Sequence, residues 1–313
     1  MKQPLSLLLA ALLSLSSPLA LSSENRSFTP NQVTSTSPER ITVKHLSGEV
    51  SVNFAPKRAF LFDFGLYDTM QSLGLSDYVA GLPLLNLPSY LKATVPTSLV
   101  NAGAMKQPDL ALISEIAPEL VVITGRQGAA FHALSEQAPT LNLGTDKQHY
   151  LSSVKANIVL IGQLYGQEER ANAQLQQLDN KIAQAKHKAA QSQQRALVLL
   201  HNEGKLMVNQ QPVISEVIGL NLVVMPSETQ GKGVSVSTEA IAQVNPDLVF
   251  IVDRSAAIGA TPFKLAQFDD AHLQQTTAYQ NSKIIILTPD LWYLSGGGLQ
   301  SLSLQIDEVL AAL

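Results

Sequence analysis

One segment in the middle of the chain, residues 151–194, limits most strongly how this sequence can fold. It contains no proline and only two glycines, Gly162 and Gly166. Alanine, glutamine, leucine and lysine dominate it, and its apolar residues recur at the spacing of one helix face. A helix of this length is too long for an ordinary crossover within one sheet domain. We therefore expect mostly one long linking helix, bent near Gly166, between two separate lobes.

Short strand and helix patterns alternate on both sides of this segment, which is typical of layered α/β domains. The stretches expected to form a hairpin or strands are 41–52, 59–65, 196–202, 248–254 and 284–288, and the expected helices cover 66–74, 213–219, 237–244 and 299–313. The predicted fold class is therefore α/β, with two α/β lobes joined by one long helix and a ligand cleft between the lobes. The predicted lobes are residues 41–150 and 195–313.

One strand sequence occurs twice. PELVVITGR covers residues 118–126 and PDLVFIVDR covers residues 246–254, so each apolar run ends in an arginine at the same offset. In open α/β sheets, ligands bind outside the carboxyl ends of the strands. If the two lobes face each other across a cleft, Arg126 and Arg254 approach one ligand. The alternative is that the two arginines form separate salt bridges on the surface.

The composition argues against several classes of function. The chain has a formal net charge of −4 and a pI of about 5.9. A nucleic-acid partner is not expected, because phosphates require a basic surface. The absence of cysteine predicts no disulfide, no thiolate metal site and no lipid-modified N-terminal cysteine. The six histidines include no i, i+4 pair, so a zinc-type site is not expected either.

The N-terminus has the features of a secretory signal peptide. Lys2 precedes a short apolar run, residues 5–13, which is followed by small residues and Pro18. The run is too short for a membrane span. We predict a cleaved signal peptide over 1–22 and a flexible leader over 23–40, which is polar and lacks periodicity. These expectations imply an exported protein without a lipid anchor, retained in the periplasm of a Gram-negative cell.

Several stretches between residue 41 and the C-terminus resemble a known family. They are LPSYL at 87–91, APELVVITGRQ at 117–127, EQAPTL at 136–141, TQGK at 229–232, NPDLVFIVDRS at 245–255 and PDLWYLSGGGLQS at 289–301. In these stretches the chain resembles the periplasmic substrate-binding proteins of ABC importers for iron–siderophore complexes and cobalamin. Within that group it is similar to the catecholate-siderophore binders of the CeuE/FatB type. The resemblance implies two α/β lobes bridged by one rigid helix.

The resemblance also implies which charged residues bind the ligand. Arginines at the two strand ends contact catecholate oxygens in the family, which implies this role for Arg126 and Arg254. Guanidinium groups suit an anionic ferric catecholate, because they donate several N–H groups and keep their charge when desolvated. A third arginine is common in a loop of the second lobe, but here that loop is VNQQP, residues 208–212. Lys205 and Lys232 are the candidates for the missing charge.

A further implied feature is a protein ligand to the iron. Family members that bind tetradentate siderophores complete the iron coordination with a tyrosine and a histidine. The tyrosine corresponds to Tyr293, and the neighbouring Trp292 is a candidate for ligand contact. The histidine position is Gln230 here, and glutamine is a poor ligand for iron(III). Three alternatives stay open: Tyr293 with water or another group, a histidine such as His201 or His132, or a hexadentate siderophore that needs no protein ligand.

Partner recognition follows from the same resemblance. In the family, a glutamate in each lobe docks onto arginines of the membrane permease. Glu239, in the first turn of the expected helix 237–244, matches the position in the second lobe. The position in the first lobe is Ala111, for which Asp109 or Glu115 is the candidate substitute.

Together these features predict a periplasmic binding protein that captures a ferric catecholate siderophore and delivers it to an inner-membrane ABC transporter. We expect a monomer without an intrinsic cofactor, in which iron(III) is bound as the siderophore complex and membrane contact occurs only through the permease. The alternatives are a haem- or corrinoid-binding protein of the same class and a secreted α/β enzyme. An enzyme is not expected, since GxSxG, HExxH and GxGxxG motifs are absent.

Overall fold

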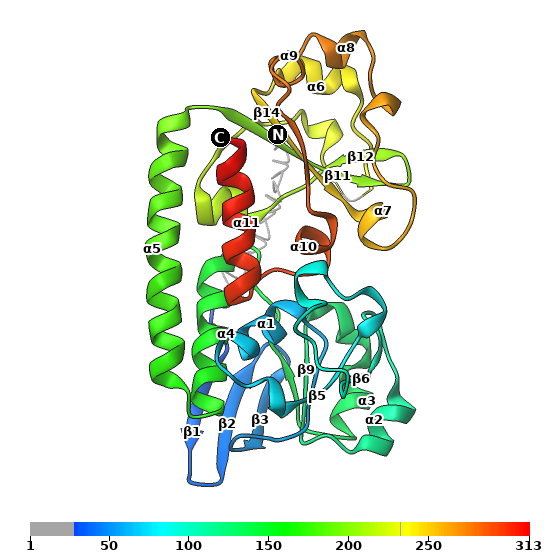
Figure 1. Cartoon of the computed structure of the whole chain (residues 1–313). Coiled ribbons are helices and arrows are strands. Elements are labelled where there is room, and N and C mark those ends of the chain that lie inside the picture. The colour runs from blue at the N-terminus through cyan, green and yellow to red at the C-terminus, as the bar shows by residue number, and fades with distance from the viewer. Residues whose placement is uncertain (1–27, 232) are drawn as a thin grey trace, which may run out of the picture.

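The computed structural model describes residues 28–231 and 233–313, which form two α/β lobes (Figure 1). The predicted signal peptide, residues 1–22, lies outside the described residues, as do residues 23–27 and Lys232. None of the helices in the described part of the chain is long and apolar enough to cross a membrane.

The first lobe contains a parallel sheet with the strand order β10–β9–β4–β5–β6. Its strands are β4 Ala59–Leu61, β5 Val79–Leu82, β6 Val100–Asn101, β9 Leu120–Ile123 and β10 Thr140–Asn142, and a small ribbon is formed by β7 Gly103–Ala104 and β8 Gln107–Pro108. The helices and short helical turns are α1 Phe64–Ser72, η1 Ser76–Tyr78, η2 Leu84–Asn86, η3 Ser89–Leu91, α2 Leu110–Ile116, η4 Gly125–Ala130 and α3 Phe131–Ser135.

The second lobe contains a sheet with the order β12–β11–β14–β15, in which β13 also pairs with β11. Its strands are β11 Arg195–Asn202, β12 Lys205–Val208, β13 Asn221–Leu222, β14 Leu248–Asp253 and β15 Ile284–Leu287. All pairs are parallel except the hairpin of β11 and β12. The helical elements are η5 Val213–Ile218, η6 Ser227–Thr229, α6 Thr238–Val244, α7 Arg254–Ala257, η7 Leu265–Gln267, α8 Ala271–Gln274 and α9 Thr277–Gln280.

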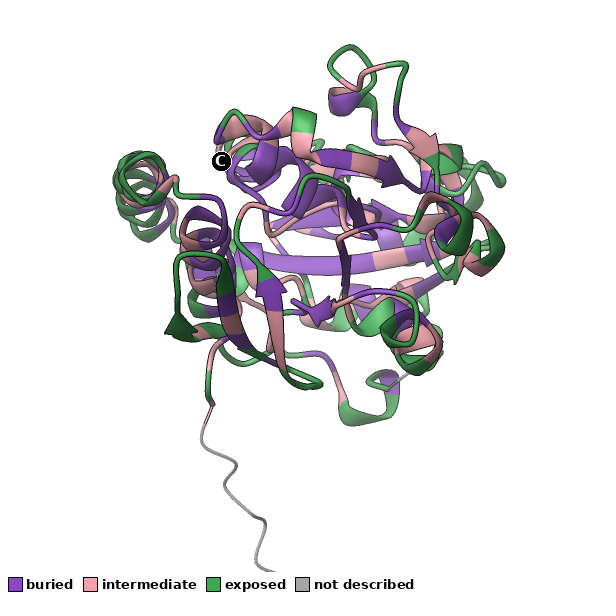
Figure 2. Ribbon diagram, turned by 90° about the horizontal axis from the view of Figure 1, so that it is seen from below, coloured by how far each residue is buried: buried purple, intermediate pink, exposed green. Residues whose placement is uncertain are grey.

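The apolar sequences of the parallel strands follow from their burial. Strands β9 and β14 are buried along their whole length, and helices or loops cover both faces of a parallel sheet, so nearly every position is apolar. Alternate residues of β9 face opposite sides: Val122 joins the large core that extends into the second lobe, whereas Val121 joins a smaller cluster with Ile113 and Leu134 of α2 and α3. Figure 2 shows the buried strands at the centre and the exposed segments around them.

The N-terminal sheet corrects part of the sequence analysis. The hairpin expected over 41–52 is confirmed as β2 Arg40–His45 and β3 Gly48–Asn53. A further strand, β1 Gln32–Thr36, pairs antiparallel with β2 inside the range predicted as a flexible leader, so the leader prediction is wrong for these residues. All but one of the β1 side chains are exposed. The strand is held by its backbone ladder, by Val33 against the core and by a hydrogen bond from Thr34 to Glu49, so its sequence shows no apolar alternation.

The linking segment is also different from the expectation. Residues 151–194 form two helices, α4 Tyr150–Leu164 and α5 Glu168–Ser192, instead of mostly one. The chain reverses between them through Gly166, which has a left-handed φ of +63°. A Cβ at Gly162 would lie 2.7 Å from the Cβ of Ala171, so α4 and α5 pack closely beside the turn. Of these two helices, α5 runs from the first lobe to the second (Figure 1).

The C-terminal part of the chain returns to the first lobe before it ends. After β15, helix α10 Pro289–Tyr293 and a glycine segment, residues 296–298, lead to α11 Leu299–Ala312. Helix α11 packs against α1 at its start and against α5 along its length. The backbone N–H of Gln300 and that of Ser301 each donate to the buried carboxylate of Asp68 in α1, both at 3.0 Å.

Candidate functional site

A cavity of about 560 Å³ lies between the lobes, a volume typical of small-molecule sites. The first lobe contributes charged and polar side chains to its wall, the second lobe contributes amides and apolar groups, and the segment after α10 completes it. The lining includes Leu46, Asp63, Thr124, Arg126, Lys147, Tyr150, Asn209, Gln211, Pro212, Val213 and the residues from Trp292 to Gly297. The predicted interlobe location of the site agrees with this cavity.

Arg126 is positioned by the turn that follows strand β9. The hydroxyl of Thr124 accepts the Arg126 backbone N–H at 3.3 Å, and the buried Gln127 amide oxygen accepts the Thr124 N–H at 2.9 Å. The guanidinium then reaches the C-terminal segment: Nη2 donates to the carbonyl of Tyr293 at 2.9 Å and Nη1 to that of Leu294 at 3.2 Å. Arg126 thus lines the cavity and also anchors its wall.

Arg254 is positioned by the corresponding strand end in the second lobe. Asp253, the last residue of β14, caps α7 by accepting the Ala256 N–H at 3.1 Å. The Arg254 Nε donates to the phenol oxygen of Tyr293 at 2.8 Å, and its Nη1 donates to the side chain of Asn202. Its guanidinium carbon lies 5.6 Å from the centre of the Tyr293 ring. Arg254 is not among the residues that line the cavity.

The two strand-end arginines therefore meet at one residue. Arg126 binds the backbone of Tyr293 and Arg254 binds its phenol oxygen, although the arginines belong to different sheets. The half-buried Tyr293 lines the cavity. Its phenol oxygen is the atom that a hard metal ion would bind, and it already accepts a charge-assisted hydrogen bond. The arrangement is suited to placing anionic oxygen and cationic guanidinium beside a bound chelate.

The other residues predicted for the site lie in different surroundings. Trp292 lines the cavity, is 4% exposed, and donates its indole N–H to Glu308 at 2.6 Å. Gln230 is exposed, donates its amide to the carbonyl of Met225 at 2.6 Å, and does not line the cavity. Lys205 is exposed at the end of the β11–β12 hairpin and does not line it either.

The two histidines proposed as iron ligands do not line the cavity. His201 is 1% exposed; its Nδ1 lies 2.8 Å from Asp253, and its Nε2 accepts the Gly204 N–H. Both ring nitrogens of His201 are thus engaged inside the second lobe. His132 of α3 is exposed and pairs with Glu136, the residue that follows the helix. In the part of the chain that the structure describes, no group of three histidines, cysteines or acids is arranged to hold a metal ion.

Several residues of the cavity wall were not predicted. Asp63 caps α1 by accepting the Leu66 N–H at 2.7 Å. Burial raises the pKa of Asp63, while the neighbouring Arg126 opposes this shift. Burial likewise raises the pKa of the Tyr150 phenol, and the nearby Asp63 adds to the effect. Asp63 and Lys147 follow the carboxyl ends of β4 and β10, so the strand-end rule that singled out Arg126 also applies to them.

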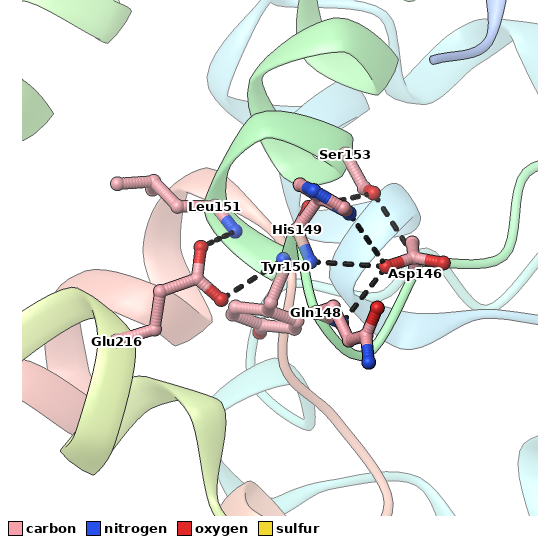
Figure 3. A network of polar contacts seen from close by, with 7 residues as sticks. All are labelled: Asp146, Gln148, His149, Tyr150, Leu151, Ser153 and Glu216. Carbon is pink, nitrogen blue, oxygen red and sulfur yellow. Dashed lines mark hydrogen bonds and ion pairs between the residues drawn. The ribbon is translucent and has the colours of Figure 1, made fainter. Parts of the chain in front are cut away.

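A residue of the second lobe binds the backbone of the first turn of α4. His149 precedes the helix but gives it no side-chain cap. Instead, the two carboxylate oxygens of Glu216 in η5 accept the backbone N–H groups of Tyr150 and Leu151, each at 3.0 Å (Figure 3). A carboxylate at a helix N-terminus also interacts favourably with the helix dipole. This contact joins the lobes directly beside the cavity.

The residues predicted to contact the permease are exposed. Glu239 is exposed in the first turn of α6. Ala111, Asp109 and Glu115 are exposed on or next to α2 of the first lobe, and Asp109 caps that helix by accepting the Leu112 N–H at 3.0 Å.

Two α/β lobes with a polar cavity at the facing ends of their sheets define a binding protein that holds its ligand between the lobes. The chain belongs to the periplasmic binding protein family, whose model matches residues 66–291. The resemblance described from the sequence is thereby confirmed.

Individual relatives agree with this assignment. The petrobactin-binding protein YclQ of Bacillus subtilis is 34% identical over 287 residues, 90% of each chain. Its crystal structure matches this chain with a TM-score of 0.84, covering 88% of this chain and 98% of that one. The ferric-anguibactin-binding protein FatB of Vibrio anguillarum is 25% identical over 86% of each chain. The siderophore-binding protein BauB, solved with ferric iron and two molecules of acinetobactin, matches with a TM-score of 0.79 and 26% identity, covering 88% of this chain and 98% of that one.

Proposed function

We propose that this protein captures a ferric siderophore with catecholate groups between its lobes and delivers it to an ABC importer. The observation that carries the proposal is the convergence of Arg126 and Arg254 on Tyr293 at the interlobe cavity. Relatives that bind petrobactin, ferric anguibactin and ferric acinetobactin support the same ligand class. Capture and release require binding only, without covalent chemistry on the ligand.

The chemistry of the wall suits an anionic chelate. Catecholate oxygens around iron(III) carry the negative charge, and guanidinium groups match them with fixed N–H donors. Tyr293 supplies a phenol oxygen, a hard donor that iron(III) prefers over an amide. With a tetradentate siderophore, we propose that Tyr293 completes the iron coordination while Arg254 stays beside the phenol oxygen.

We propose further that the protein is exported, acts in the periplasm as a monomer and docks onto its permease through Glu239. The exposed position of Glu239 at the start of α6 is compatible with docking. Glu239→Arg should leave ferric siderophore binding unchanged and abolish uptake by cells that depend on this protein. Normal uptake with the variant would remove Glu239 from the interface.

A fluorescence titration tests the ligand. Trp292 is the sole tryptophan and lines the cavity, so a bound ferric catecholate should quench it. The purified protein is titrated with ferric bis- and tris-catecholates, and the visible charge-transfer band of the complex is recorded. Tyr293→Phe should weaken bis-catecholate binding and shift the band if Tyr293 ligates the iron. Equal affinity and an unchanged band would mean that the site recognises the complex through charge alone.

The same assay distinguishes the alternatives. Titrations with haem and with cobalamin run beside those with ferric catecholates. Saturable quenching by haem or cobalamin, without any response to ferric catecholates, would overturn the siderophore proposal.

A further inference from the structure

We propose that Lys147 lines the cavity as a cation beside Arg126 and binds the ligand's anionic oxygens, presented by a loop that Asp146 holds in place. The inference rests on the proposed function and assigns a specificity-determining residue to its site. Lys147 would supply the positive charge that family members obtain from an arginine in the loop 208–212, where this chain has Gln210 and Gln211.

Lys147 lies on the same edge of the first sheet as Arg126. Strand β10 pairs in parallel with β9, with Asn142 beside Ile123. The chain leaves both strands at this edge, and the two exits lead to Lys147 and Arg126. Both residues line the cavity, and both are exposed.

The loop that carries Lys147 is fixed by its neighbours (Figure 3). The Asp146 carboxylate accepts the backbone N–H of Gln148 at 2.8 Å and that of His149 at 3.0 Å. The Asp146 N–H donates to the hydroxyl of Ser153 at 3.0 Å. The hydrogen bond from Gln148, and then that from the His149 ring, lower the pKa of Asp146 and keep it ionised. The backbone of the loop is therefore ordered before a ligand binds.

The Lys147 side chain is free to take a ligand. In residues 28–231 and 233–313, its ammonium makes no hydrogen bond or ion pair with another residue. The carboxylate of the neighbouring Asp146 binds the loop backbone and the His149 ring, and not the Lys147 ammonium. Because the loop backbone is already ordered, binding an anion costs the rotamer freedom of the Lys147 side chain and no loop ordering.

The charges on the cavity wall indicate that Lys147 decides whether the wall attracts an anionic ligand. Among the described lining residues, the cations are Arg126 and Lys147, and the carboxylate is Asp63. The second lobe contributes uncharged groups such as Asn209 and Gln211, and Arg254 lies outside the lining. Without Lys147, Arg126 faces Asp63 and the wall has no formal excess of positive charge. With Lys147 the first lobe becomes the attractive side, so the anionic oxygens of the chelate should face it.

The test compares Lys147→Gln and Lys147→Glu with Lys92→Gln, an exposed lysine that does not line the cavity. Affinity for a ferric bis-catecholate is measured by quenching of Trp292 at low and high salt. Lys147→Gln should weaken binding about ten- to a hundredfold and reduce the salt dependence, Lys147→Glu should weaken it more, and Lys92→Gln should match the wild type. Unchanged melting temperatures establish that the variants are folded.

A second variant tests the positioning role of Asp146. Asp146→Ala should weaken binding when Lys147 is present but add little to the loss in Lys147→Gln, as a double-mutant cycle would show. Wild-type affinity in Lys147→Gln, with a wild type that binds, would overturn this inference and leave the proposed function intact. If the wild type binds no ferric catecholate, both the proposed function and this inference are wrong.

Discussion

The contact between α1 and the glycine segment 296–298 leaves no room for a side chain at Gly65. A Cβ added there would lie 2.8 Å from both the carbonyl carbon of Gly296 and the nitrogen of Gly298, and closer still to the Gly296 oxygen. All of these atoms belong to the backbone, so no side-chain rotation relieves the clash. The two segments would have to separate by roughly 1 Å to restore ordinary contact.

The expected loss of stability in Gly65→Ala follows from this geometry. Overpacking costs about 1–3 kcal/mol, and a clash with rigid backbone belongs at the upper end of that range. Alanine inside a helix regains about 0.5–1 kcal/mol relative to glycine. We therefore expect Gly65→Ala to lower the free energy of unfolding by about 2–2.5 kcal/mol and the melting temperature by roughly 4–10 °C. Because Gly296 and Gly297 line the cavity, the affinity for a ferric catecholate should fall as well.

Differential scanning calorimetry and the fluorescence titration measure the two effects. Gly128→Ala is the matched control, because a Cβ at that exposed glycine meets no atom within 4 Å. The control should melt and bind like the wild type. If Gly65→Ala also melts within about 1 °C of the wild type and binds equally well, the close approach of α1 to the glycine segment is refuted.

Three further predictions concern single side chains. Glu216→Ala removes the carboxylate from the N-terminus of α4 and should cost about 1–2 kcal/mol in chemical denaturation; unchanged stability would mean that water replaces it without loss. Burial raises the pKa of Asp68 from 3.8 to about 7, so its stabilising contribution is full below the unfolded pKa and is lost as the pH rises through about 7. The free energy of unfolding should therefore fall between about pH 4 and 7 more steeply in the wild type than in Asp68→Asn, and equal slopes would contradict this. Arg126→Lys keeps the charge but loses the paired donation to the carbonyls of residues 293 and 294, so ferric catecholate affinity should drop about tenfold; an unaltered dissociation constant would show that charge alone suffices.

The local features of the fold were predictable from the sequence. Strands β9 and β14 are continuous apolar runs followed by arginine, and their existence and burial follow from their sequences. That both arginines reach one ligand stays a prediction of the strand-end rule. The family membership likewise followed from short stretches such as the one around Tyr293. These signals are contained within a few consecutive residues.

Features that depend on distant contacts were not predictable. The break between α4 and α5 requires the left-handed Gly166 together with close packing at Gly162, whereas the apolar period continues through both helices. Strand β1 pairs with β2 through its backbone, and Val33 is its apolar contact with the core, so it has no alternating apolar pattern. The bond from Glu216 to the start of α4 joins residues about sixty-five positions apart, and no local pattern indicates it.

Three chain segments join the two lobes: helix α5, the stretch around α10, and helix α11 (Figure 1). Helix α11 is fastened at both ends, since Leu299 donates its N–H to Thr69 of the first lobe and the Ala312 carbonyl accepts from Lys283 of the second. A single connecting helix can bend by itself, but connecting segments that lie side by side must deform together. These connections should restrict movement of the two lobes relative to each other. The overall shape of the molecule should therefore hardly change when the ligand binds. Small-angle X-ray scattering should accordingly give nearly the same radius of gyration with and without ferric siderophore.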